Sequence, residues 1–269
     1  MIQNILFDMG NVLIHFDRSV FLDRLDISEK DKQLLLREVF VSVEWVQMDR
    51  GTLTEPEAES LMCRRLPSHL QEAVHQLVSL WDDPILPVAG MSQLVEELKQ
   101  NGYGIYLLSN ASLRQHAYWP RIPGWQFFDG KVISADEKVM KPHPDYYRTA
   151  LKRLGLKPEE CFFIDDVPAN IEGALYCGIS GAVFHQDVSL LRSQLRSMGV
   201  KVSEKSRRKI PKDCVIPARS ISVATAQPEI AAVAQKHHCS YDCHNSGIPA
   251  IIDSSAKVAN QLEQRNRYL

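Results

Sequence analysis

Acidic side chains stand at the ends of two apolar stretches, a position where α/β proteins often place their chemistry. One stretch leads into Asp8 and then Gly10, and the other ends in the adjacent pair Asp165 and Asp166. An aspartate at the tip of a strand can act as a nucleophile, and a glycine nearby lets the backbone approach a bound ion or phosphate. Neighbouring carboxylates repel each other, which indicates a cation, and carboxylate oxygens suit Mg²⁺.

Two further polar sites follow the same pattern. Ser109 and Asn110 end a second apolar run, and a hydroxyl followed by the amides of a helix start suits a phosphate oxygen. Lys141 stands at a helix entrance beside Pro142 and can neutralise phosphate as a compact cation. Each residue also has a structural interpretation: Asp8 as a turn residue, Ser109 as a helix cap and Lys141 as a solvated surface side chain.

The elements that must position these residues alternate along the chain. Short apolar strands recur and alternate with helices. Three helices begin near residues 90, 144 and 168 and end at Gly102, Gly155 and Gly178, and a last helix carries Leu190, Leu191 and Leu195. The predicted strands are 5–8, 105–108, 131–134, 161–165 and 182–184. Repeated strand-helix units of this kind predict a parallel sheet with helices on its faces.

Residues 18–84 lack a strand pattern and predict a helical insertion after the first strand. Within it, Thr54 and Glu57 form a capping box with Pro56 in the first turn. An insertion at this point would lie over the carboxyl ends of the strands, where a lid could exclude water and contact a substrate. Trp45, Met48 and Arg50 either face that substrate, or the first two belong to the core of the insertion and Arg50 to its surface.

Composition limits the class of protein. The chain has 269 residues, of which 45% are hydrophobic and 24% charged, and this is enough for one large or two small domains. No apolar run is long enough to span a bilayer and no signal-peptide pattern opens the chain, so a cytoplasmic protein without a membrane partner is expected. The six cysteines are scattered, which favours reduced thiols over a disulfide framework.

Charge divides the chain near residue 200. Residues 201–269 hold 11 Lys and Arg against 6 Asp and Glu, whereas residues 1–200 hold 20 against 27. The basic run 205–212 has no interleaved aromatics, so a solvated linker is expected and not a nucleic-acid site. The segment 237–244 gathers His and Cys, but structural zinc sites need two well-spaced pairs, and no function is assigned to 201–269.

Taken in order, Asp8, Ser109-Asn110, Lys141 and Asp165-Asp166 resemble the motifs of the haloacid dehalogenase-like (HAD) superfamily over about residues 1–200. The segments 7–13 and 163–174 look like the subgroup that includes bacterial α-D-glucose-1-phosphate phosphatase and the phosphatase domain of soluble epoxide hydrolase. The resemblance implies a Rossmann-like α/β core from 1–17 and 85–200, a helical cap from 18–84, and a C-terminal extension from 201–269. It also implies a Mg²⁺-dependent phosphatase acting on a small phosphorylated metabolite.

The resemblance implies a role for each matching residue. Asp8 would attack phosphorus and form an aspartyl-phosphate, while Lys141 would offset the charge of the phosphoryl oxygens. Ser109 and Asn110 would bind those oxygens. The metal ligands would be the Asp8 carboxylate, the Gly10 carbonyl and Asp166, with Asp165 and Asn170 supporting them from behind or through water.

One position departs from the family pattern. Most phosphatases of the superfamily carry a second aspartate two residues after the nucleophile, which protonates the leaving oxygen and later activates water. Here that residue is Gly10. Loss of such an acid typically costs about 10²–10⁴-fold in rate. The sequence therefore predicts a substrate whose leaving group needs little protonation, such as a sugar 1-phosphate.

Two other functions remain open at this stage. A metal-independent 2-haloacid dehalogenase also uses a strand-tip aspartate without the second one, although the pair Asp165-Asp166 would then have no purpose. A non-catalytic module that binds a phosphorylated ligand would be the result if the missing acid at Gly10 abolished turnover. Oligomeric state is not predicted.

Overall fold

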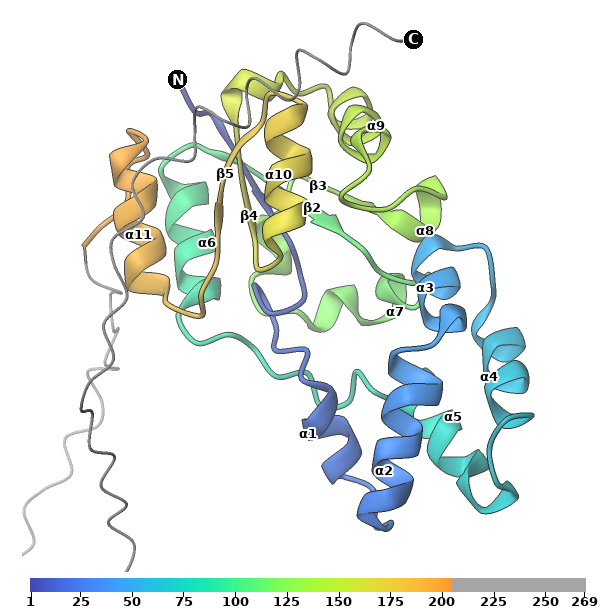
Figure 1. Cartoon of the computed structure of the whole chain (residues 1–269). Coiled ribbons are helices and arrows are strands. Elements are labelled where there is room, and N and C mark those ends of the chain that lie inside the picture. Colours follow the sequence, from blue (N-terminus) through green and yellow to red (C-terminus); the bar gives the residue numbers. More distant parts are fainter. Residues whose placement is uncertain (205–269) are drawn as a thin grey trace, which may run out of the picture. The chain divides into compact units, whose positions relative to one another are not determined.

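The computed structural model describes residues 1–204, and the basic run 205–212 and the His/Cys cluster 237–244 lie outside the described residues. Five parallel strands form one sheet in the order β3-β2-β1-β4-β5 (Figure 1). Their bounds are β1 Asn4–Phe7, β2 Gly104–Ser109, β3 Gly130–Ile133, β4 Cys161–Asp165 and β5 Ser180–Val183. The predicted α/β fold with a parallel sheet and a helical insertion after the first strand is confirmed.

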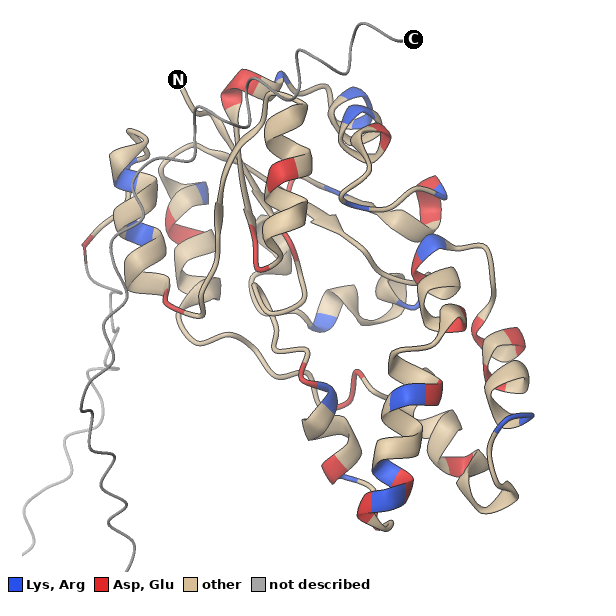
Figure 2. Ribbon diagram, viewed as in Figure 1, with Lys and Arg blue, Asp and Glu red and all other residues tan. Residues whose placement is uncertain are grey.

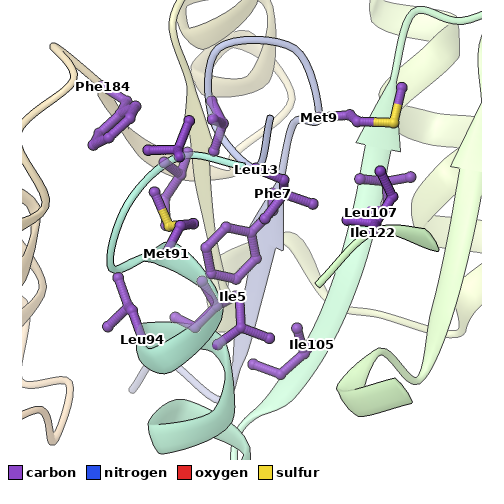
Figure 3. Close-up of a cluster of buried hydrophobic side chains, with 14 of the residues drawn as sticks. Ile5, Phe7, Met9, Leu13, Met91, Leu94, Ile105, Leu107, Ile122 and Phe184 are labelled. Carbon is purple, nitrogen blue, oxygen red and sulfur yellow. The ribbon is translucent and has the colours of Figure 1, made fainter. Parts of the chain in front are cut away.

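Side chains alternate between the two faces of the sheet because successive residues of a strand point in opposite directions. On β1, Ile5 and Phe7 enter one hydrophobic cluster and Leu6 enters another. Figure 3 shows the first cluster, in which Ile5 and Phe7 lie beside Met91 and Leu94. Both faces are apolar, as expected for a parallel sheet that helices cover on both sides.

Four helices cover the sheet, two on each face (Figure 1). Helices α6 (Met91–Gln100) and α11 (Val188–Ser197) supply side chains to the cluster of Phe7. Helices α9 (Pro144–Leu154) and α10 (Pro168–Tyr176) supply the cluster of Leu6. Short helices complete the core, namely α7 Gln115–Tyr118, η3 Trp119–Arg121, η4 Trp125–Phe127, α8 Ser134–Glu137 and η5 Pro158–Glu160.

The segment between β1 and α6 contains a hydrophobic cluster of its own. Its elements are α1 Arg18–Asp23, α2 Glu29–Leu35, η1 Leu36–Phe40, α3 Val43–Arg50, α4 Glu55–Cys63, η2 Ser68–Leu70 and α5 Gln71–Ser79. The expected capping box at Thr54 and Glu57 is present. The insertion thus has a hydrophobic cluster of its own, and Trp81 packs against both this cluster and that of Phe7. Its domain limits at residues 18 and 84 stay a prediction.

Helix α3 decides between the two interpretations of its side chains. Met48 is 3% exposed and belongs to the insertion's own core. Trp45 is partly buried against the same cluster, and Arg50 is exposed. Met48 is therefore a packing residue, and the interpretation in which it faces a substrate is wrong because its side chain is buried in the hydrophobic cluster of the insertion.

The insertion is docked on the loop that follows β2. The Ser112 hydroxyl donates to Glu55 of α4 at 3.3 Å, and Arg114 pairs with both Glu55 and the buried Asp82. The hydroxyl of Ser134, at the start of α8, donates to the backbone carbonyl of Asp49 in α3. These contacts hold the end of α3 close to the carboxyl ends of β2 and β3.

No helix among residues 1–204 is long and apolar enough to cross a lipid bilayer. Figure 2 shows acidic and basic residues interspersed along the helices. The cysteines at 63, 161 and 177 are free thiols, as expected for the described part of the chain. The cytoplasmic location stays a prediction.

Gly173 provides a test of how α10 is packed. A Cβ on this residue would lie 2.4 Å from the Pro142 carbonyl oxygen and 3.0 Å from Tyr147. We expect Gly173→Ala to lower the free energy of unfolding by about 1–3 kcal/mol, because overpacking against backbone outweighs the gain in helix propensity. Chemical denaturation measures this change. The exposed neighbour Glu172 is the control, and Glu172→Ala should stay within about 0.5 kcal/mol; an equal or higher stability of Gly173→Ala would contradict the packing described.

Candidate active site

Asp8 lies directly beyond the end of β1 and is 8% exposed. Its backbone N–H donates to the Ile164 carbonyl at 2.8 Å, which extends the pairing of β1 with β4 past the end of the strand. This register brings Asp8 beside Asp165 and Asp166. One ligand oxygen from each of the three carboxylates lies within 4.8 Å of the others, and Figure 2 shows the acidic colour where β1 and β4 end.

Lys141 lies between two of these carboxylates. Its Nζ is 2.8 Å from Asp8 Oδ1 and 2.6 Å from Asp165 Oδ2, and it also donates to the Leu108 carbonyl at 2.9 Å. The side chain is 1% exposed. The alternative of a solvated surface lysine is therefore wrong, because the loop before α9 turns this side chain into the sheet edge.

Burial and charge together set the protonation of this group. Burial disfavours the Lys141 cation, but Asp8 and Asp165 outweigh it, so the pKa of Lys141 is raised. Burial also raises the pKa of Asp8 to about 7, with the Lys141 cation opposing this shift and the Asp165 charge adding to it. Without a metal ion, the nucleophile candidate is thus only partly ionised at neutral pH.

Asp165 is fully buried and its oxygens are engaged by neighbours. Oδ2 accepts from Lys141, Oδ1 accepts from the Val167 amide at 2.8 Å, and Asn170 Nδ2 donates to both oxygens at 3.0 Å. Three donors fix the orientation of this carboxylate. Its position between Lys141 and Asn170 suits support of the site better than direct contact with an ion.

Asp166 is more open and is oriented by Asn11, a residue for which the sequence analysis assigned no role. Asn11 Nδ2 donates to Asp166 Oδ2 at 3.0 Å, and Asn11 Oδ1 accepts from the Phe16 amide at 3.0 Å. Burial raises the pKa of Asp166, and the Asn11 hydrogen bond lowers it in part. Asn11 has φ 54°, a left-handed conformation that asparagine adopts more readily than most residues. An asparagine directly after Gly10 was therefore the sequence signal that could have drawn attention to this position.

Ser109 and Asn110 end β2 beside Lys141. Ser109 is 1% exposed, and its carbonyl accepts from the Tyr146 hydroxyl at 3.3 Å. Both polar atoms of the Asn110 side chain bind the Lys141 backbone, donating to its carbonyl at 3.0 Å and accepting from its amide at 2.9 Å. In this structure the Asn110 side chain therefore positions Lys141.

The donor set fits Mg²⁺. Three clustered carboxylates supply hard oxygen ligands, and the cluster contains no imidazole or thiolate that would favour zinc. The carboxylate charges exceed the single Lys141 cation, so a divalent ion would complete the balance.

Gly10 lies beside Phe16, which precedes the insertion and packs against aromatic rings of it. A Cβ built on Gly10 would meet Phe16 Cβ at 3.7 Å. The Phe16 ring lies 6.0 Å from that of Trp45 and 5.1 Å from that of Trp81, and all three residues are partly exposed. Partly exposed aromatic surface thus borders the nucleophile turn.

Asp49 of α3 is the second residue near the site that the sequence analysis missed. The Ser112 amide and the Trp45 side chain lie near its carboxyl and favour the charged form. Desolvation raises the pKa of Asp49 to about 8, and the charge of Asp8 adds to the shift. The available signal was its spacing from Trp45, since residues four apart share one face of a helix.

Comparison with known proteins places this geometry in a family. Residues 2–178 match the family model of the haloacid dehalogenase-like hydrolases. The chain is 26% identical over 204 residues to drimenol cyclase from Aspergillus calidoustus, covering 74% of this chain and 37% of that protein. It is 29% identical over 185 residues to a sesquiterpene phosphatase from Aspergillus oryzae, covering 65% of this chain and 86% of that protein.

The fold is also shared with solved structures. A HAD family enzyme from Bacteroides thetaiotaomicron, in complex with magnesium and inorganic phosphate, is 22% identical with a TM-score of 0.55. The match covers 71% of this chain and 99% of that one. At this identity the likeness establishes the fold.

The raised pKa of Asp8 predicts how metal binding depends on pH. Mg²⁺ binds the ionised carboxylate, so below about pH 7 a proton competes with the ion. We expect the apparent Mg²⁺ affinity to increase roughly tenfold between pH 6 and pH 8. Titration calorimetry of the metal-free protein measures it, together with the protons released. Asp8→Asn serves as the control and should bind more weakly with a flatter pH dependence; a constant affinity in the unaltered protein would contradict the expectation.

Proposed function

The chain belongs to the haloacid dehalogenase-like hydrolase family, and from that premise we propose that it is a Mg²⁺-dependent phosphatase acting on a small phosphorylated metabolite. The observation that carries this proposal is the position of the Lys141 ammonium, 2.8 Å from Asp8 and 2.6 Å from Asp165. A buried cation beside a strand-tip carboxylate suits the binding of a phosphoryl group next to its nucleophile.

In the proposed reaction, Asp8 attacks phosphorus and forms an aspartyl-phosphate, which water then hydrolyses. Lys141 offsets the charge of the phosphoryl oxygens, and the Ser109 hydroxyl binds one of them. Asn110 binds the Lys141 backbone through its side chain and so keeps the cation in place. We also propose that Asn110, like Ser109, contacts the phosphoryl oxygens.

The proposed Mg²⁺ ligands are the Asp8 carboxylate, the Gly10 carbonyl and Asp166. Asp165 and Asn170 support them, since Asn170 donates to both Asp165 oxygens. Asn11 orients Asp166. The ion would neutralise charge between the nucleophile and the phosphoryl group.

Two alternatives are weaker. A metal-independent dehalogenase would gain nothing from the cluster of Asp8, Asp165 and Asp166, which is costly to assemble without a cation. A non-catalytic binding module would not need a buried lysine 2.8 Å from a carboxylate in the position of a nucleophile. The comparison with a sesquiterpene phosphatase supports the phosphatase, although the chain spans only 37% of the length of the other relative, a cyclase.

The finer proposal concerns the substrate. Gly10 leaves the turn after β1 without an acidic side chain, which favours a leaving group that needs little protonation, such as a sugar 1-phosphate. The aromatic surface of Phe16, Trp45 and Trp81 favours a second class, an isoprenoid phosphate, because it offers apolar contact beside the turn.

The phosphatase proposal is tested with p-nitrophenyl phosphate. We expect Mg²⁺-dependent release of phosphate, its loss on chelation, and a decrease of at least about 10³-fold in Asp8→Asn, since the amide is not a nucleophile. A steady-state assay with and without EDTA measures it. Asp26→Asn, an exposed residue of the insertion, is the control. Chloride release from 2-chloropropionate without Mg²⁺ would favour the dehalogenase, and binding of phosphate without turnover would favour the binding module.

The substrate proposal predicts a preference between isomers. We expect kcat/KM for glucose 1-phosphate to exceed that for glucose 6-phosphate by at least about tenfold, because the anomeric oxygen leaves more readily than a primary alkoxide. Phosphate release from the two sugar phosphates measures this preference. Farnesyl phosphate, assayed in parallel, tests the isoprenoid phosphate class. A preference for the 6-phosphate would exclude the sugar 1-phosphate proposal and leave the phosphatase proposal intact.

A further inference from the structure

The insertion holds the residue Asp49 against the catalytic edge of the core. The Asp49 carboxyl lies near the amide of Ser112, which is three residues after Ser109 and favours the charged form of the carboxyl. Its backbone carbonyl accepts from Ser134, and the Ser134 hydroxyl in turn accepts from the Ala111 amide at 3.0 Å. The end of α3 is thus tied to the loop after β2 and to the end of β3, where the proposed phosphate site lies.

Charged groups of both signs surround Asp49. Arg18 of α1 favours its charged form and Asp8 disfavours it, while the buried Tyr118 of α7 also lies within its field. Lys138 of α8 donates to the Gly51 carbonyl, two residues beyond Asp49. Desolvation is the largest influence on the group and raises its pKa to about 8, which favours the protonated form at neutral pH. A protonated carboxyl near a nucleophile is the form that a general acid requires.

The space at position 10 shows that the missing acid is not a result of packing. A Cβ on Gly10 would make ordinary contact with Phe16 Cβ at 3.7 Å, and its backbone is outside the left-handed region. A residue with a Cβ would therefore be accommodated there without backbone strain. The acid is absent from the core while a protonated carboxyl is present on the insertion.

We propose that Asp49 is the general acid and base of this site, in place of the carboxyl that position 10 lacks. In the first step an Asp8 oxygen bonds to phosphorus, the bond from phosphorus to the leaving oxygen breaks with its electron pair, and that oxygen takes the Asp49 proton. In the second step the Asp49 carboxylate takes a proton from water as the water oxygen bonds to phosphorus. The bond between phosphorus and Asp8 then breaks, which returns the Asp8 carboxylate and releases phosphate. This inference rests on the proposed phosphatase function but not on the sugar 1-phosphate proposal, because an acid on the insertion would protonate leaving groups that do not depart easily by themselves.

The proposal makes catalysis depend on the docked insertion. Glu55 and Asp82 bind the loop that carries Ser112 through Arg114, at 3.4 and 2.6 Å. These ion pairs hold Asp49 against the core. An acid carried by the insertion also links the chemistry to the part of the chain that would contact the leaving group.

The test compares two aryl phosphates in the full-length, Mg²⁺-loaded protein. p-Nitrophenolate leaves without a proton, whereas phenolate from phenyl phosphate needs one. In Asp49→Asn we expect kcat/KM to fall by about 10²–10⁴-fold for phenyl phosphate and by less than about tenfold for p-nitrophenyl phosphate. The amide keeps an acceptor for the Ser112 amide, so the change removes the proton and preserves the shape. Asp26→Asn, exposed on the same insertion, should leave both values unchanged.

A second measurement tests whether Asp49 acts as the base that activates water. Because water is no longer activated in Asp49→Asn, we expect the aspartyl-phosphate to accumulate with p-nitrophenyl phosphate, visible as a burst of p-nitrophenolate and as phosphorylated protein by intact mass spectrometry. In the unaltered protein, we also expect kcat/KM for phenyl phosphate to decrease as the pH rises through about 8, because Asp49 then loses the proton that it must donate. Asp49→Asn should lack that decline.

An equal loss for both substrates in Asp49→Asn would assign Asp49 a structural role and overturn the proposal, as would activity equal to that of Asp26→Asn. Failure of the phosphatase function gives a different result. In that case the unaltered protein would hydrolyse neither ester and would form no phosphorylated intermediate.

Discussion

The charge balance around Lys141 is the constraint on which the site depends. A buried ammonium 2.8 Å from Asp8 and 2.6 Å from Asp165 allows carboxylates to lie close together in a region that excludes water. Without it, desolvation and mutual repulsion would keep the acids protonated or apart. The Lys141 charge does not neutralise all three carboxylates, and the remaining negative charge is what gives the site its affinity for a divalent cation.

The fold supplies this arrangement through parallel register. Strands β1, β2 and β4 are neighbours, so their carboxyl ends present Asp8, Ser109 and Asp165 at one edge of the sheet. Lys141 comes from the loop before α9 and is held by Asn110, while Asn170 of α10 fixes Asp165. Close packing of α10 on Pro142, where Gly173 leaves no room for a Cβ, keeps the lysine loop against the sheet. Residues that never touch a substrate thereby decide where the charged atoms lie.

The insertion has two distinct sides. Its interior, which includes Met48, packs as an independent hydrophobic cluster. Its edge, including Asp49 and Glu55, contacts the loop after β2. Phe16, just before the insertion, lies beside the turn at Gly10 and packs against Trp45 and Trp81 of the insertion. This edge would link the chemistry of the core to the choice of leaving group, because it brings the Asp49 carboxyl, the proposed acid, and apolar surface close together.

The sequence by itself determined the alternating strand-helix order, the helical insertion after the first strand, and the candidate residues at the strand ends, because apolar periodicity and the glycine and proline signals are local. The capping box at Thr54 and the helix ends at Gly155 and Gly178 are of this kind. Strand order, the burial of Lys141, the use of Asn110 to hold it, and the approach of Asp49 and Asn11 to the site were decided only by the tertiary structure. These features depend on which atoms meet across long separations in sequence, and on the removal of water from charged groups, and neither is written in the spacing of residues along the chain.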